Sequence, residues 1–370
     1  MSKLFEKTKI KGMELDNRFV RSATWEGLAT EEGAATPDLT RKMVDLAQGE
    51  VGLIISSHTY VSPEGQAGPW QLGIYKDELV SGLKDMTTAV HEAGGTIVMQ
   101  LAHSGCLARE SLTRTRPLAV SAIEGLVDGP VKEADQRDIQ GLIDAFAAAA
   151  ARAKEAGFDG VQIHSAHGYL LSQFLSPKFN HRQDEYGGGI ENRVRIHKQI
   201  CRAVREAVGE KYPLLIKMNC RDFAEDGLEL KDSLAAGSIL AASGLDGIEI
   251  SGGLGMNKTK IPSRMGIDSR EKEAYFSQEA KAFREAVELP LFLVGGIRSL
   301  EVAEALVENQ TVDYISLCRP LIREPDLVKR WKNGDRSRAA CVSDNLCFVP
   351  TRKGLGVYCL TEEQERKKED

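Results

Sequence analysis

The segment Gly160-Val-Gln-Ile-His-Ser-Ala-His-Gly-Tyr169 joins a short apolar run to two histidines and a tyrosine. The apolar run has the length and composition of a buried β-strand. His164, His167 and Tyr169 follow at its end. Imidazole and phenol groups donate hydrogen bonds without a permanent charge, so together they can hold a carbonyl oxygen and deliver a proton. The less favoured alternative is that the two histidines are a zinc pair or satisfied core residues.

The composition is that of an ordinary globular protein. The chain has 370 residues, of which 42% are hydrophobic and 28% charged, and its formal net charge is −6. We therefore expect no nucleic-acid partner. No apolar run approaches the roughly 20 residues of a membrane span, and the N-terminus lacks the apolar core of a signal peptide. Seven scattered cysteines argue against a secreted disulfide framework, so we expect a cytoplasmic protein.

The chain contains an internal sequence repeat. The segment Ala156-Gly-Phe-Asp-Gly-Val-Gln-Ile-His164 is similar to Ser243-Gly-Leu-Asp-Gly-Ile-Glu-Ile-Ser251, and two weaker repeats lie at 49–56 and 310–318. Each copy follows a helical stretch and predicts a glycine stop, a short turn and a buried strand. Eight strands are predicted: Phe19–Thr24, Gly52–His58, Thr96–Leu101, Gly160–His164, Leu214–Asn219, Gly247–Ser251, Leu291–Val294 and Tyr314–Cys318.

Eight helices are predicted to alternate with these strands: Asp38–Gln48, Glu78–Ala93, Asp138–Ala156, Asn192–Val208, Leu230–Ser243, Ser277–Val287, Leu300–Glu308 and Asp326–Lys332. Alternating strands and helices indicate a parallel sheet, and this number of units predicts a (β/α)8 TIM barrel. Before them, Lys9–Leu15 predicts a hairpin that closes the N-terminal mouth of the barrel. We expect the barrel domain to cover residues 1–335 and a C-terminal extension to cover residues 336–370.

The residues at the predicted strand ends are polar and partly basic, with almost no carboxylate. Because hydrolytic metal sites usually use Asp or Glu, a large anionic cofactor fits this pattern better. A metal-dependent hydrolase or lyase using His58, His103, His164 and His167 remains an alternative. Gly295-Gly296 and Arg319 follow the last two strands, where this fold often binds phosphate. Gly295-Gly296 is equally compatible with a simple tight turn.

Several motifs resemble those of the old yellow enzyme family of FMN-containing NADH:flavin oxidoreductases. They include Gln100-Leu-Ala-His-Ser-Gly105, His164-Ser-Ala-His-Gly-Tyr169, Gln173-Phe-Leu-Ser-Pro177, Asp184-Glu-Tyr-Gly-Gly188 and Glu191-Asn-Arg193, and the similarity runs from about residue 4 to 331. The resemblance implies FMN across the C-terminal mouth. The cofactor residues that it implies are Ser22, Ala23, Thr24, Ser57, His58, Gln100, Lys217, Ser251, Gly252, Gly253, Gly295, Gly296, Cys318 and Arg319.

The resemblance also implies an ene-reductase mechanism. NADH or NADPH reduces FMN, which then transfers hydride to the β-carbon of a small α,β-unsaturated carbonyl compound. His164 and His167 bind the carbonyl oxygen, and Tyr169 donates the proton. Lys217 stands near flavin N1. The family forms dimers and larger assemblies, which makes a homo-oligomer an option here. An FMN-binding partner or electron-transfer subunit without ene-reductase activity is the other alternative.

Three regions depart from the family pattern or stay open. Trp25 stands where many members have Cys or Thr, so either it changes the flavin potential and the shape of the pocket, or its indole packs aside. The loop 257–276, with Tyr275, is either a substrate-selecting cover or a solvated surface, and residues 106–136 are predicted to be irregular. The tail holds Cys341, Cys347 and Cys359 in a segment similar to a [4Fe–4S] site that lacks one cysteine, so we expect no intact cluster and no other metal. We expect no regular structure from Thr361 onward.

Overall fold

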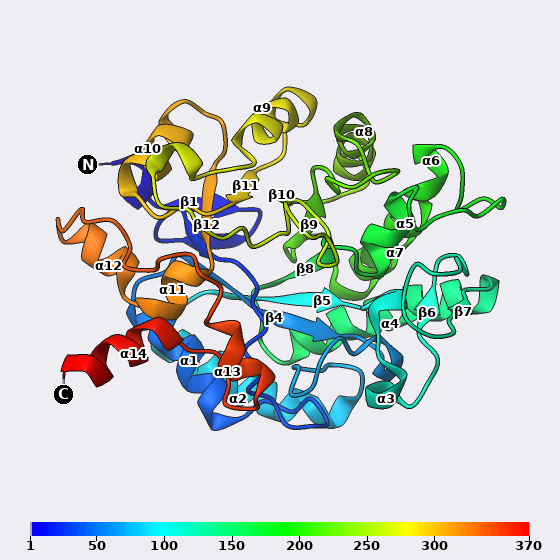
Figure 1. The fold of residues 1–370 in the computed structure, drawn as a ribbon, viewed down its shortest axis with the longest axis horizontal. Coiled ribbons are helices and arrows are strands. Elements are labelled where there is room, and N and C mark those ends of the chain that lie inside the picture. The colour runs from blue at the N-terminus through cyan, green and yellow to red at the C-terminus, as the bar shows by residue number, and fades with distance from the viewer. Residues whose placement is uncertain (1, 370) are drawn as a thin grey trace.

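The computed structural model describes residues 2–369, and these contain a closed barrel of eight parallel strands (Figure 1). The strands follow one another around the barrel in chain order: β3 (Phe19–Arg21), β4 (Leu53–Tyr60), β5 (Ile97–Ala102), β8 (Gly160–Ser165), β9 (Leu214–Asn219), β10 (Gly247–Ser251), β11 (Leu291–Val294) and β12 (Tyr314–Leu317). This arrangement confirms the predicted (β/α)8 barrel.

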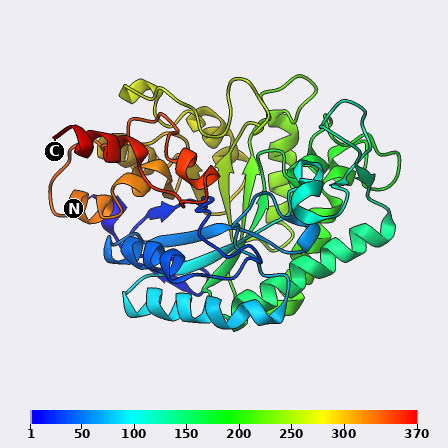
Figure 2. The same cartoon turned by 60° about the horizontal axis from the view of Figure 1, so that its bottom comes forward.

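A helix of the outer layer follows each barrel strand (Figure 2). These helices are α1 (Pro37–Gln48), α2 (Val80–Glu92), α4 (Gln136–Glu155), α7 (Arg195–Val208), α8 (Leu230–Ala241), α9 (Ser277–Ala286), α10 (Leu300–Glu308) and α12 (Leu327–Lys332). The local sequence favours several of these starts. Asp135 and Asp138 form a capping box at α4, and Thr36 caps α1 directly before Pro37.

The repeated phrase has a structural reason in its aspartate. Asp159 and Asp246 belong to the two strong copies, and Asp313 belongs to a weaker echo. Each carboxylate accepts a hydrogen bond of 2.8 Å from the first backbone amide of the preceding parallel strand, at Ile97, Leu214 and Leu291 respectively. Each aspartate therefore fixes the register of two adjacent strands at the N-terminal end of the barrel.

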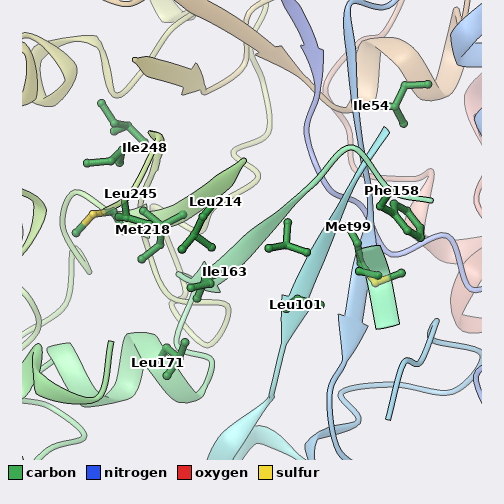
Figure 3. Close-up of a cluster of buried hydrophobic side chains, with 14 of the residues drawn as sticks. Ile54, Met99, Leu101, Phe158, Ile163, Leu171, Leu214, Met218, Leu245 and Ile248 are labelled. Carbon is green, nitrogen blue, oxygen red and sulfur yellow. The ribbon is translucent and has the colours of Figure 1, made fainter. Parts of the chain in front are cut away.

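The main core lies between the strands and the outer helices (Figure 3). Ile163, Met218 and Ile248 belong to this buried cluster and alternate along their strands with polar residues. Because successive strand residues point to opposite faces, the polar alternates point into the barrel.

The inside of the barrel changes from apolar to polar along the strands. At the N-terminal end, Val20, Val98, Leu215 and Phe292 form a buried cluster with residues of a hairpin. The hairpin pairs β1 (Thr8–Ile10) with β2 (Met13–Leu15) in antiparallel register, which confirms the predicted hairpin, and its apolar residues pack into the barrel mouth. Polar residues follow nearer the C-terminal end and lead to the cavity described below.

Some local predictions were wrong because tertiary contacts decide these segments. Residues 106–136 are not irregular throughout, since they contain α3 (Glu110–Thr113) and the paired strands β6 (Leu118–Ala119) and β7 (Lys132–Glu133). The helix predicted at 192–208 is divided into α6 (Ile190–Arg193) and α7. Three short helices were not predicted: α5 (Leu170–Leu175), α11 (Arg319–Arg323) and α13 (Phe348–Arg352).

The predicted irregular tail is also helical. Helix α14 (Leu360–Glu369) carries the pairs Glu362–Arg366 and Glu363–Lys367 at helical spacing, and Glu365 pairs with Arg323 of α11. The last residue of that prediction, Asp370, lies outside the described residues. Within residues 2–369, no helix is both long enough and apolar enough to cross a membrane.

Candidate cofactor and active site

A cavity opens at the C-terminal ends of the barrel strands. The space inside it is about 230 Å³, and it is about 990 Å³ when the open mouth is included. Most of the predicted site residues line it: Ser22, Ala23, Thr24, Trp25, His58, Gln100, His164, His167, Tyr169, Lys217, Ser251, Tyr275, Gly296, Cys318 and Arg319.

Four predicted residues lie outside the cavity wall. The hydroxyl of Ser57 donates to the buried carboxylate of Glu26. Side-chain atoms at Gly252 and Gly253 would collide with the Cys220 sulfur at 2.9 Å and with the Lys260 carbonyl at 2.3 Å, respectively. Gly295 lies next to the wall, against the rings of Tyr275 and Phe276. Close packing therefore accounts for Gly252 and Gly253.

Sequence reasoning did not identify ten residues of the wall. They are Pro262, Ser263, Val294, Ile297, Arg298, Ser316, Leu317, Pro320, Ser343 and Phe348. Alternation along β12 would have identified Ser316, because it lies two residues from both Tyr314 and Cys318 on the inner face. Ser343 and Phe348 carry no such signal, since only tertiary folding brings the C-terminal segment to the cavity.

His164, His167 and Tyr169 form one side of the cavity. The ring centroids of His164 and His167 are 5.2 Å apart, and those of His164 and Tyr169 are 5.1 Å apart in perpendicular planes. The Tyr169 ring also stacks on His58 at 5.7 Å. Three hydrogen-bonding side chains from one strand end and the following turn therefore face one ligand position.

The backbone of His167 is held in an uncommon conformation. Its φ is 66°, in the left-handed region that non-glycine residues rarely adopt. The side-chain oxygen of Asn219 accepts from the His167 N–H at 3.1 Å, and the Gly255 N–H donates to the His167 carbonyl at 3.1 Å. The last residue of β9 and the loop after β10 thus hold the backbone of His167 from two sides. Asn219 is a positioning residue that the sequence analysis did not assign.

Burial keeps these side chains neutral. Desolvation, followed by nearby positive charge, lowers the pKa of His164 and His167 well below the ordinary histidine value. Desolvation also lowers the pKa of His58 to about 4 and raises the pKa of Tyr169 to about 12. At neutral pH the histidines are therefore uncharged, and the Tyr169 phenol retains its proton.

The remaining cavity wall is basic. Lys217, Arg298 and Arg319 line it, and no aspartate or glutamate of the described chain does. His164 Nδ1, Arg298 Nε and Ser316 Oγ are buried and have no hydrogen-bond partner within residues 2–369. A large, polar and anionic ligand such as FMN fits a wall with this charge and these unpaired groups.

The C-terminal segment closes one edge of the cavity. The Asn345 amide oxygen accepts from Arg319 at 2.8 Å and from the Ser263 hydroxyl at 2.8 Å. Cys318 lies in the wall with its sulfur 3.1 Å from the Thr24 hydroxyl oxygen, and Cys341 and Cys347 are buried. These contacts join the extension to the barrel, so the division at residue 335 stays a prediction.

The four histidines of the metal alternative do not all line the cavity. His103 is buried but does not line the cavity. Its Nδ1 accepts a hydrogen bond from the Gly105 N–H at 3.0 Å, and its Nε2 lies 3.7 Å from the Glu64 carboxylate. Across residues 2–369, no three His, Cys, Asp or Glu side chains are grouped so that they could hold a metal ion.

Comparisons with known proteins show the family of the chain and agree with its fold. The model of the NADH:flavin oxidoreductase / NADH oxidase family matches residues 3–337. An NADH oxidase of Thermoanaerobacter brockii is 33% identical over 355 residues, which cover 94% of this chain and 54% of that protein. The chain therefore spans about half the length of that relative.

Two further relatives are matched over nearly their full length. An NADPH dehydrogenase of Bacillus subtilis (strain 168) is 35% identical over 324 residues, covering 87% of this chain and 92% of that protein. Among solved structures, an old yellow enzyme homologue from Zymomonas mobilis superposes with a TM-score of 0.77 at 28% identity, covering 92% of this chain and 95% of that one.

Proposed function

This chain belongs to the NADH:flavin oxidoreductase / NADH oxidase family, the family of the old yellow enzymes, and we propose that it is an FMN-dependent ene-reductase. Its substrates are small α,β-unsaturated carbonyl compounds, and NADH or NADPH is the reductant. The observation that carries this proposal is the position of His164, His167 and Tyr169 on one side of a basic cavity. When bound there, FMN would accept hydride from the nicotinamide and pass it to the β-carbon of the alkene.

The two histidines hold the carbonyl oxygen of the substrate. Ser251 Oγ lies 2.8 Å from His167 Nε2, which leaves Nδ1 as the free ring nitrogen. When Nε2 accepts the Ser251 proton, a neutral ring carries its own proton on Nδ1 and can donate it to the substrate oxygen. His164 supplies the second donor. Two fixed, neutral donors stabilise negative charge on that oxygen without adding a buried cation.

Tyr169 supplies the proton. Its phenol stays protonated because burial raises the pKa to about 12. Its ring is fixed between His58 and His164, so the hydroxyl is directed by packing on both sides. We assign it to protonation of the α-carbon, on the side of the alkene opposite to hydride delivery.

Charged and polar residues of the same cavity would hold the cofactor, and one of them, Lys217, is paired in register with His164 on the adjacent strand. Lys217 would face the pyrimidine edge of the flavin with Gln100, and Arg319 with Gly296 would hold the phosphate. Trp25 and Tyr275 bound the space left for the substrate.

Anaerobic half-reactions test this proposal. Purified protein loaded with FMN is reduced with NADH or NADPH and then mixed with a panel of enones, enoate esters and dienoyl thioesters. We expect nucleotide-dependent bleaching and reoxidation by at least one substrate class. H164A should slow reoxidation by about 100-fold or more, because one oxyanion donor is worth ~3 kcal/mol, while bleaching by the nucleotide is retained.

Controls separate the roles of individual residues. Y169F should retain substrate binding but slow product formation, and H181A, which removes an exposed histidine, should behave like the unaltered protein. Bleaching without reoxidation by any substrate would favour an electron-transfer subunit. A colourless, zinc-containing protein that does not take up FMN would overturn the proposal.

A further inference from the structure

Two buried polar residues inside the barrel lie directly behind the cavity wall. Glu249 and Gln162 are fully buried, and neither lines the cavity. Their strand neighbours in register do line it: Lys217 is paired with Glu249, and Gln100 with Gln162. The mechanism above uses Lys217 and Gln100 but gives no role to the pair behind them.

The four side chains and Ser22 form a continuous row across the inside of the barrel. Gln100 Nε2 donates to Gln162 Oε1 at 2.7 Å, and Gln162 Nε2 donates to Glu249 Oε2 at 3.0 Å. The other carboxylate oxygen of Glu249 lies 3.4 Å from Lys217 Nζ. Lys217 Nζ in turn donates to the Ser22 hydroxyl at 2.7 Å.

The carboxylate sets the direction of the whole row. An ionised glutamate only accepts hydrogen bonds, so Gln162 must turn its NH₂ group toward Glu249. The Gln162 carbonyl oxygen then faces Gln100, which must donate its own NH₂ group to it. The Gln100 carbonyl oxygen is consequently left as an acceptor for a ligand in the cavity.

The same carboxylate opposes the charge of Lys217. Glu249 Oε1 accepts no hydrogen bond within residues 2–369, and Lys217 is the cation that it faces. Both side chains are excluded from solvent, so their charges are screened weakly and act at short range on each other and on any ligand.

We propose that Glu249 is a positioning residue for the flavin site, where it offsets the charge of Lys217 and orients the Gln100 acceptor. The inference rests on the proposed function, since it assumes that FMN binds over Lys217. With a neutral residue at position 249, the charge of Lys217 is unopposed, and the anionic reduced cofactor is favoured over the oxidised cofactor.

The midpoint potential of bound FMN, measured anaerobically with reference dyes, tests this inference. E249Q should increase the affinity for reduced FMN, relative to that for oxidised FMN, by about tenfold. For a two-electron couple this corresponds to a midpoint potential about 30 mV more positive. E249D retains the charge on a shorter side chain and should stay close to the unaltered potential. This pair separates charge from shape.

A double-variant cycle tests whether Glu249 acts through Lys217. K217Q should move the potential to a more negative value. The double variant E249Q/K217Q should return it toward the unaltered value, with a smaller effect of E249Q than in the presence of Lys217. If E249Q alone fails to fold, the double variant remains testable, because its two neutral amides can bond to each other. A double variant whose potential does not rise above that of K217Q then overturns the role of Glu249.

The outcomes distinguish this inference from the proposed function. An unchanged potential in E249Q, or the same shift in E249Q with and without Lys217, overturns the role of Glu249. That result leaves enone reduction by the unaltered protein untouched. Failure of the unaltered protein to bind FMN instead overturns the proposed function itself.

Discussion

The Nε2 atom of His167 lies 2.8 Å from the hydroxyl oxygen of Ser251, so a residue at the end of β10 orients a side chain that follows β8. Both the ring orientation and the tautomer of His167 depend on this one contact. The proposed oxyanion site is therefore built from two neighbouring regions of the barrel rim rather than from one loop.

Removing the Ser251 hydroxyl should weaken catalysis without abolishing it. In S251A the imidazole loses a hydrogen bond worth about 1 kcal/mol, so we expect enone-dependent reoxidation to be about five- to tenfold slower. Stopped-flow measurement of flavin reoxidation gives this rate directly. S238A removes an exposed hydroxyl of α8 and serves as the control. An S251A rate equal to that of the unaltered protein would show that His167 is oriented by other contacts.

Stability should decrease as the pH falls from 6.5 to about 5. Burial lowers the pKa of His58 to about 4 and lowers that of His164 and His167 well below 6.5. The unfolded chain therefore binds protons in this range before the folded chain does. The contribution of these three histidines to the free energy of unfolding is therefore constant above pH 6.5 and decreases as the pH falls below 6.5.

Urea unfolding at a series of pH values tests this expectation. H58N removes one of the three titrating groups. It should reduce the slope of the free energy of unfolding against pH by at most about 1.4 kcal/mol per pH unit. A flat profile between pH 6.5 and 5 in the unaltered protein would contradict the neutral, buried state of these histidines.

Gly296 should be intolerant of a side chain. Its φ is 72°, and an added Cβ would lie 2.7 Å from the Tyr275 ring. In G296A the alanine strains the backbone and its Cβ displaces the Tyr275 ring from the cavity wall. We therefore expect FMN binding to be at least about tenfold weaker and the melting temperature to be lower. G209A is a matched control, because Gly209 has a φ of 84° with open space around it. Equal FMN affinity in both variants would remove Tyr275 from the site.

Trp25 should limit the size of the substrate. Its indole N–H donates to the Pro69 carbonyl at 3.3 Å, which holds the ring at the cavity wall. In W25A we expect the ratio of kcat/KM for a bulky enone to that for a small enone to rise by about tenfold or more. W25F retains an aromatic ring and should change the ratio less. If neither variant alters the ratio, the indole lies outside the path of the substrate.

The barrel could be predicted from the sequence because its signals are local. The two strong repeats each contain a glycine stop followed by a short buried strand, and the strands β9, β10 and β11 have the predicted bounds. Gly157 and Gly244 adopt the positive φ that a helix stop requires. The register role of Asp159 and its equivalents was not predicted, because it depends on which strand lies beside each turn.

Strand ends were the strongest local signal for the residues that line the cavity. Because strand ends meet at one rim of a barrel, His164, Lys217 and Ser251 were expected to lie together, and all three line the cavity. Glycines near the rim were harder to assign, since close packing and phosphate binding require the same residue. Gly252 and Gly253 show this difficulty, because steric contacts already account for them. Ser343 and Phe348 belong to the C-terminal extension, and no strand periodicity in the sequence predicts where this extension lies.

The contact of Asn345 with Arg319 and Ser263 has a consequence for the order of events during synthesis. Ser263 and Asn345 are 82 positions apart in the chain, and Ser343 and Phe348 complete the cavity wall. The barrel strands all precede residue 318. Every strand is therefore synthesised before Ser343 and Phe348. A cofactor that contacts the whole wall therefore requires Ser343 and Phe348 to be packed in place beside the barrel strands.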